Sequence, residues 1–211
     1  MISLTINDKK VKVAEDLSVL EAIREQGIYI PTLCYHEALQ PVGSCRLCVV
    51  EVEENRRTRT AASCVTPLTK DMIIRTDTEK IQRIRRILLE LLLARCPGLR
   101  ILEKMAAQIG VKKVRFAEED DDCFLCGQCV RACKEIVGVS AIGFSDRGVN
   151  NKIGAPFLKA SNVCISCGTC TSICPAGTFH LERVDNLVTL HRYSSEYRQE
   201  KCRICGEHFV A

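Results

Sequence analysis

Apolar residues at every second position mark the strands in the first third of the chain. Segment 2–6 alternates apolar and polar residues, and 11–13 continues the alternation after a short polar turn. A further strand is predicted over 49–53, followed by an exposed hairpin tip over 55–59, and a last strand is predicted over 72–74. This spacing predicts a small sheet with one buried face.

Helical periodicity appears in three places. Ser18 and Glu21 have the spacing of a capping box, which predicts a helix over 19–26. A longer helix is predicted over 79–95 and a shorter one over 99–109. The apolar stripe of the long helix is Ile81, Ile84, Ile87, Leu88, Leu91 and Leu92. Alternation returns near the C-terminus, where 179–184 and 187–191 predict a hairpin with its turn at 185–186.

Composition narrows the class of protein. The chain has 15 Cys among 211 residues and a formal net charge of +4, with 5% aromatic residues. Its first ten residues lack the apolar core of a signal peptide, and an odd number of closely spaced Cys suits metal ligation better than disulfides. The longest apolar run, 87–94, is too short to span a membrane. The low aromatic content and nearly balanced charge disfavour nucleic-acid binding. We therefore expect a soluble cytoplasmic protein that holds metal.

Two Cys runs share one spacing. Both read C-x2-C-x2-C-x3-C, and the second follows the first after 41 residues. This is the spacing of bacterial ferredoxins, in which the fourth Cys of each run ligates the cluster of the other run. Zinc knuckles are the alternative, but structural zinc takes four ligands, commonly as two separate pairs. We assign one [4Fe–4S] cluster, cluster A, to Cys123, Cys126, Cys129 and Cys174. We assign the other, cluster B, to Cys133, Cys164, Cys167 and Cys170.

A third Cys group lies within the predicted sheet. Cys34, Cys45, Cys48 and Cys64 have the spacing C-x10-C-x2-C-x15-C, with Gly and Ser before the close pair. One close pair with two remote Cys resembles a plant-type [2Fe–2S] site, although the first gap is ten residues rather than four. A four-Cys zinc site is the alternative. We expect a [2Fe–2S] cluster on a β-grasp fold.

The motif Gly43-Ser44-Cys45-Arg46-Leu47-Cys48 resembles the N-terminal electron-transfer region of the large iron–sulfur subunit of complex I. It also resembles the related subunits of NAD(P)-linked [FeFe] hydrogenases and formate dehydrogenases, as do segments 129–133 and 138–144. The resemblance covers about residues 1–180. It implies an α+β chain with a [2Fe–2S] ferredoxin-like domain over 1–77, a helical linker over 78–115, and a bacterial-type 2[4Fe–4S] dicluster ferredoxin domain over 116–180. A tail over 181–211 follows.

The sequence departs from that family in two respects. Members usually carry a cluster held by one His and three Cys after the long helix, whereas 94–100 here contains only Cys96 and no His. We therefore expect that cluster to be absent. Members also usually continue into a catalytic domain, and this chain ends at Ala211. The expectation is a chain with electron-transfer centres and no catalytic centre.

A last Cys pair lies near the C-terminus. Cys202, Cys205 and His208 resemble half of a zinc ribbon or a fragment of another cluster site. Three ligands are one too few, so His180, His191, Cys96 or a partner chain would have to complete the site. An unligated thiol pair is the alternative. Zinc is the metal we expect here.

The resulting hypothesis is an electron-transfer subunit of a multi-subunit oxidoreductase linked to NAD(P)H or ferredoxin, of the hydrogenase, formate dehydrogenase or electron-bifurcating type. No dinucleotide-binding fingerprint or P-loop is present, so flavin and nucleotide are expected in a partner subunit, with another redox centre in a second. Arg83, Arg85 and Arg86 of the long helix are candidate docking residues. The rival interpretations are a free multi-cluster ferredoxin carrier and a zinc-binding adaptor protein.

Overall fold

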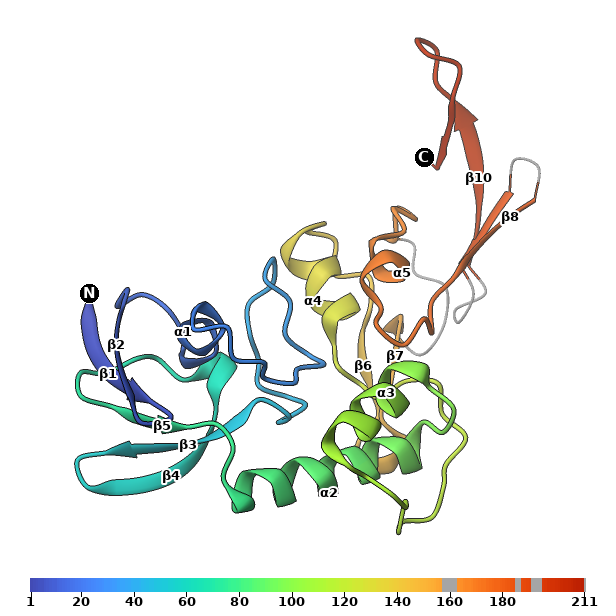
Figure 1. Ribbon diagram of the computed structural model, residues 1–211. Coiled ribbons are helices and arrows are strands. Elements are labelled where there is room, and N and C mark those ends of the chain that lie inside the picture. Colours follow the sequence, from blue (N-terminus) through green and yellow to red (C-terminus); the bar gives the residue numbers. More distant parts are fainter. Residues whose placement is uncertain (157–162, 185–186, 191–194, 211) are drawn as a thin grey trace. The chain divides into compact units, whose positions relative to one another are not determined.

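The computed structural model describes residues 1–156, 163–184, 187–190 and 195–210, and these form two compact units (Figure 1). The first unit is Met1–Cys126 and the second is Gly127–Ala211. Sheets and helices alternate irregularly along the chain, which confirms the α+β class. Within the described residues, no helix combines the length and the apolar character needed to cross a bilayer.

The first unit is built on a five-stranded sheet with the order β2-β1-β5-β3-β4. Strand β1 pairs parallel with β5, and the other neighbours are antiparallel. The strands are β1 Ile2–Ile6, β2 Lys9–Val13, β3 Val49–Glu54, β4 Arg57–Ala62 and β5 Ile73–Arg75. The predicted strands over 2–6, 11–13, 49–53 and 72–74 are confirmed. The predicted tip over 55–59 was too long, because the turn occupies only two residues and β4 begins at Arg57.

Helix α1, Val19–Glu25, packs its apolar side on this sheet. Leu20, Ala22 and Ile23 are fully buried, and β1 contributes Leu4 and Ile6 to the same core. The predicted capping box is present: the Ser18 N–H donates to Glu21 Oε2 at 2.7 Å, and Glu21 N–H donates to Ser18 Oγ at 3.3 Å. Local capping and core burial therefore act together on this helix.

Helices α2, Glu79–Arg95, and α3, Arg100–Ile109, follow the sheet and pack against each other (Figure 1). Both agree with the predicted helices. The predicted stripe on α2 was partly wrong, because Ile87 and Leu91 are exposed. The residues that α2 buries are Ile81, Arg85, Leu89, Glu90 and Ala94. The buried face of α2 therefore includes Arg85 and Glu90 and differs from the face that hydropathy alone indicated.

The second unit contains two short helices, α4 Gln128–Glu135 and α5 Thr169–Ile173, which pack against each other. A two-stranded sheet joins β6, Gly143–Ser145, to β7, Lys152–Gly154. The C-terminal sheet has the order β11-β10-β9-β8, from β8 Leu181–Val184, β9 Leu187–Leu190, β10 Ser195–Lys201 and β11 His208–Val210. The predicted hairpin corresponds to β8 and β9. Its turn at 185–186 lies outside the described residues.

Candidate metal centres

The four Cys of the first group come from three loops beside the five-stranded sheet. Cys34 follows α1, Cys45 and Cys48 precede β3, and Cys64 lies in a 3-10 turn directly after β4. The side chains of Cys34, Cys48 and Cys64 are no more than 1% exposed. Cys48 and Cys64 thus lie just beyond the same end of the paired strands β3 and β4.

These thiols associate in two pairs. Cys45 N–H donates to Cys34 Sγ at 3.4 Å, and the Sγ atoms of Cys48 and Cys64 lie 3.4 Å apart. Cys34 lowers the pKa of Cys45 to about 6, and Cys64 lowers the pKa of Cys48 to about 6, because one thiol of each pair hydrogen-bonds to the other's thiolate. The pKa values of the donors Cys34 and Cys64 are raised correspondingly. Two thiol pairs suit a two-iron cluster, in which each iron takes two thiolates.

The loop around the close pair adopts a backbone that few residues tolerate. Gly43 has φ +62° and Arg46, between the two Cys, has φ +59°. A Cβ on Gly43 would lie 3.1 Å from Val65 Cγ2, a tight contact with the neighbouring 3-10 turn. Left-handed conformations at non-glycine residues concentrate at functional sites, since surrounding contacts must hold them.

The two Cys runs of the dicluster segment have matching backbone conformations. In the first run Leu125 has φ +54° and Gly127 has φ +70°; in the second, Ser166 has φ +52° and Gly168 has φ +75°. Each glycine is the N-cap residue of the helix that follows, α4 or α5. The same left-handed positions in both loops indicate one binding device used twice.

All four Cys assigned to cluster B line a single cavity in the second unit. Cys133 comes from α4, Cys164 and Cys167 from the loop before α5, and Cys170 from α5 itself. The rest of the lining is mainly apolar and includes Val137, Val139, Ala141, Ile142 and Ile165. Soft thiol donors around one largely apolar cavity fit a [4Fe–4S] cluster.

Hydrogen bonds to sulfur accompany this arrangement. Ala141 N–H donates to Cys133 Sγ at 3.2 Å, and Thr169 Oγ1 lies 3.3 Å from Cys167 Sγ. Burial and the neighbouring Cys164 and Cys167 raise the pKa of Cys170 to about 11. A thiol with a raised pKa still ionises when it coordinates iron. The positive charge of the iron offsets the cost of burial and the repulsion from the neighbouring Cys.

The residues assigned to cluster A are divided between the units. Cys123 and Cys126 end the first unit, and both are buried. Cys129 lies buried in the first turn of α4, and Cys174 is the half-buried C-cap residue of α5. Their joint ligation of one cluster therefore stays a prediction from spacing.

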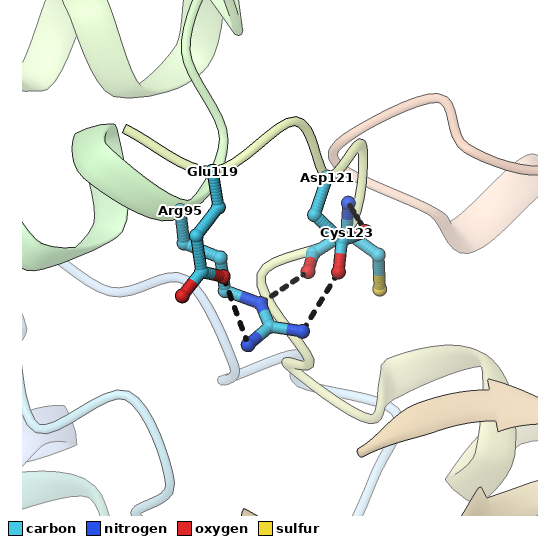
Figure 2. A network of polar contacts seen from close by, with 4 residues as sticks. All are labelled: Arg95, Glu119, Asp121 and Cys123. Atoms are coloured by element: carbon cyan, nitrogen blue, oxygen red, sulfur yellow. Dashed lines mark hydrogen bonds and ion pairs between the residues drawn. The ribbon is translucent and has the colours of Figure 1, made fainter. Parts of the chain in front are cut away.

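A network of polar contacts holds the segment that leads into Cys123 (Figure 2). Arg95, the last residue of α2, donates from Nη2 to Asp121 Oδ2 at 2.7 Å and from Nε to the Cys123 carbonyl at 3.1 Å. Glu119 Oε2 lies 3.8 Å from Arg95 Nη1. The sequence did not predict this role for Arg95, because the residues it contacts are more than twenty positions away.

Arg85 also contradicts its predicted role. It was a candidate for docking a partner, but it is 7% exposed and donates to the carbonyls of Leu47 and Val49 at 3.1 and 2.8 Å. Cys96, the lone Cys after α2, is fully buried, and burial raises its pKa to about 12. Neither residue is available at the surface of the chain.

The C-terminal Cys pair lies in the turn between β10 and β11. Cys202 N–H donates to the Glu207 carbonyl at 2.8 Å, and Gly206 N–H donates to the Cys202 carbonyl at 3.0 Å. The backbone N–H groups of Cys205 and Ile204 lower the pKa of Cys202. His208 begins β11, His180 is exposed, and His191 lies outside the described residues. Among the described residues, no three His, Cys, Asp or Glu side chains are arranged to hold a single metal ion.

Two family models match the chain. The 2Fe-2S iron-sulfur cluster binding domain matches residues 1–79, and the 4Fe-4S dicluster domain matches residues 122–178. The matches cover the two segments in which the structure gathers Cys residues. They establish one [2Fe–2S] domain followed by one domain of the two-cluster [4Fe–4S] type.

Curated relatives match most of this chain and are themselves much longer. The chain is 33% identical over 204 residues to an NADH-quinone oxidoreductase subunit of Rhizobium meliloti, covering 84% of this chain and 24% of the relative. It is 35% identical over 203 residues to the alpha subunit of the NADPH-Fe(3+) oxidoreductase of Geobacter sulfurreducens, with 84% and 24% covered. The chain therefore spans about a quarter of the length of these curated relatives.

A solved structure is similar over most of both chains. It is a crystal structure of NAD+-reducing [NiFe]-hydrogenase in the H2-reduced state, with a TM-score of 0.63 and 31% sequence identity. The similarity covers 73% of this chain and 74% of the chain in that structure. The sequence comparison and the structural comparison thus both return proteins named as NAD- or NADP-linked oxidoreductases.

Proposed function

The chain belongs to the family of iron–sulfur subunits represented by these NADH-, NADPH- and hydrogen-linked oxidoreductases, and on that premise we propose that it is an electron-relay subunit of a multi-subunit oxidoreductase. It would pass electrons between a flavin- or NAD(P)-binding partner and another redox centre, in a complex of the hydrogenase, formate dehydrogenase or electron-bifurcating type. The observation that carries this proposal is the cavity lined by four Cys in the second unit.

Three clusters would occupy the Cys groups. Cys34, Cys45, Cys48 and Cys64 would hold the [2Fe–2S] cluster. Cluster A would be held by Cys123, Cys126, Cys129 and Cys174, and cluster B by Cys133, Cys164, Cys167 and Cys170. Each cluster, when bound, supplies one site for reversible one-electron transfer. The chain would divide into the [2Fe–2S] domain over 1–77, the helical linker over 78–115, the dicluster domain over 116–180 and the tail over 181–211.

The protein's own groups contribute ligands and their orientation. Cys45 and Cys48 ionise readily, so each thiol pair of the first group has one thiolate available near neutral pH. The N–H of Ala141 directs a partial positive charge at Cys133 Sγ. Hydrogen bonds to ligand sulfurs favour the reduced form of a cluster, because they disperse its added negative charge.

We further propose that the tail binds zinc through Cys202 and Cys205, with His208 as a third ligand. The hydrogen-bonded turn between β10 and β11 supports this, because its backbone N–H groups stabilise the Cys202 thiolate. A fourth ligand would come from a partner subunit. Cys96 is not a suitable fourth ligand, since it is fully buried at the end of α2.

The proposed location is the cytoplasm, and the proposed partners are a flavin- or NAD(P)-binding subunit, a catalytic redox subunit and ferredoxin as an exchange partner. The relatives that carry the same domains are named as subunits, which supports a partnered rather than a solitary chain.

Anaerobic purification tests the relay. We expect a brown protein with about ten iron atoms per chain and reducible EPR signals of both cluster types. Co-purification from the native cell should yield a flavoprotein subunit. A correctly folded protein without iron or colour would exclude the relay and leave a zinc-binding scaffold. A cluster-loaded chain isolated alone would instead indicate a free carrier.

The tail is tested separately by metal analysis of the cluster-loaded chain. Cys202→Ser with Cys205→Ser should abolish bound zinc and leave the iron content unchanged. The matched control is Cys96→Ser, which should retain zinc. Equal zinc in all three proteins would contradict the proposed site.

A further inference from the structure

Helix α2 carries two arginines that reach the ligand loops of two different clusters. Arg85 contacts the segment that contains Cys48, and Arg95 contacts Cys123 itself. The two residues are ten positions apart, which is about 15 Å along the axis of an α-helix. Both contacts lie within the first unit.

Arg85 bonds to the backbone on both sides of a cluster ligand. Its Nε donates to the Leu47 carbonyl at 3.1 Å and its Nη2 donates to the Val49 carbonyl at 2.8 Å. The carbonyl between them, that of Cys48, accepts from Ser63 Oγ at 2.7 Å. Three consecutive carbonyls are thus held by side chains, and the planar guanidinium sets the separation of two of them.

The charge of Arg85 has no acidic counterpart in direct contact. The guanidinium is buried, yet none of the ion pairs found among the described residues includes it. Burial lowers the pKa of Arg85, and the negative charges of Asp77 and Cys48 oppose that effect. A buried charge that is hydrogen-bonded but forms no ion pair still bears a desolvation cost. A cluster held by four thiolates carries net negative charge and would compensate for it.

Arg95 is placed differently. Its guanidinium bonds to the Cys123 carbonyl, but its charge is neutralised by Asp121 at 2.7 Å and by Glu119 at 3.8 Å (Figure 2). Asp121 in turn accepts from Cys123 N–H at 3.1 Å. The segment is also tied to α2 by its backbone, since Glu119 N–H donates to the Ala94 carbonyl. Both backbone polar groups of Cys123 are therefore held from the end of α2.

We propose that α2 is the element that positions the ligand loops of the [2Fe–2S] cluster and of cluster A, with Arg85 and Arg95 as its positioning residues. This inference rests on the proposed function. Arg85 also supplies a buried positive charge to the [2Fe–2S] site and raises its reduction potential, because the reduced cluster carries one more negative charge. Arg95 acts by holding the Cys123 segment in position.

The test is an EPR-monitored redox titration of the anaerobic, cluster-loaded full chain, with the rate of iron loss to a chelator as the second readout. Arg85→Gln should make reduction of the [2Fe–2S] cluster about tenfold less favourable, a shift of about 59 mV to lower potential. Arg95→Gln should accelerate loss of iron from cluster A several-fold. Exposed Arg86→Gln and Arg100→Gln are the matched controls and should match the original chain in both readouts.

Arg85→Lys keeps the positive charge but cannot bridge two carbonyls, so it separates the effect of the charge from the positioning of the loop. It also replaces Arg85→Gln as the test if that variant does not fold. It should retain the potential and lose [2Fe–2S] iron faster. The inference is overturned if the [2Fe–2S] reduction potential of Arg85→Gln equals that of Arg86→Gln, or if Arg85→Lys lowers this potential. It is also overturned if Arg95→Gln loses iron no faster than Arg100→Gln. Those outcomes leave the proposed function intact, which fails if the unsubstituted chain shows no reducible cluster or is isolated without a partner subunit.

Discussion

At the scale of single residues, hydrogen bonds from nearby side chains and backbone groups set the state of the Cys side chains. The pKa of Cys48 falls to about 6 because Cys64 hydrogen-bonds to its thiolate. The Cys133 sulfur accepts from the Ala141 N–H. A side chain's contribution here thus depends on one contact with a residue that is distant in sequence.

Replacing Cys174 tests which residues share a cluster. Cys174→Ser should remove or destabilise cluster A, whose other expected ligands are about 45 residues earlier in the sequence, and leave cluster B intact. EPR of the reduced protein would distinguish the two [4Fe–4S] signals. Cys133→Ser is the matched variant and should damage cluster B instead. Loss of cluster B in Cys174→Ser would show that each run ligates its own cluster.

Gly127 illustrates a residue required for its backbone. Its φ of +70° lies in the left-handed region, so Gly127→Ala should destabilise the protein by about 1–2 kcal/mol. The Cζ atom of Phe144, 3.0 Å from the added Cβ, belongs to an exposed ring that can turn away, so the backbone strain dominates. Anaerobic denaturant titration would measure the loss. Gly143→Ala, where the backbone is not left-handed and space is open, should cost far less; equal losses would refute this explanation.

At the scale of elements, each helix combines a local signal with a tertiary one. Helix α1 begins at a capping box and is completed by burial of its apolar face. Helix α2 begins similarly, with Thr78 Oγ1 accepting from Ile81 N–H at 3.3 Å. Its buried face, however, includes polar residues such as Glu90, which pairs with Arg115 at 2.5 Å. Helix position is therefore a local property, whereas helix orientation depends on distant partners.

The capping box of α1 predicts a contribution to stability that is the same at pH 7 and pH 5 and is lost only in more acidic solution. Hydrogen bonds from Ser18 hold the pKa of Glu21 below its usual value, so the carboxylate stabilises the fold fully above that usual value and loses this contribution as the pH falls through the lowered one. Ser18→Ala should cost about 0.5–2 kcal/mol. The loss should be equal at pH 7 and pH 5, because Glu21 is ionised at both. Denaturant titrations at the two pH values would check it, with exposed Ser3→Ala as control; a loss that disappears at pH 5 would contradict the assignment.

At the scale of the whole molecule, the Cys groups differ in their protection from solvent. Three of the four thiols in the first group are almost fully buried, whereas Cys167 of the second unit is exposed and Cys164 and Cys170 are half-buried. The chain thus combines a shielded site with a more accessible one. Accessibility suits exchange with a partner, and it also admits oxidants and chelators.

This difference predicts the order in which the isolated chain loses its clusters. Under air with a chelator, cluster B should decay several-fold faster than the [2Fe–2S] cluster, because its ligands are reached by solvent. Absorbance and EPR followed over time would measure both decays. Added partner subunit should slow the loss of cluster B. Faster decay of the [2Fe–2S] cluster would show that burial of its thiols does not protect it.

The sequence by itself determined which segments form the cluster domains and where the elements lie. Cys spacing predicted both domains, and alternation, capping and helical periodicity predicted β1, α1 and α2, because these signals are local and repeat within a few residues. The tertiary structure decided what α2 contacts. Arg85 and Arg95 look like surface charges in the sequence, and only the fold brings them to carbonyls 28 to 38 residues away. Hydropathy describes a side chain's preference for water. Whether a charged side chain can be buried depends on the hydrogen-bonding partners that the folded chain supplies.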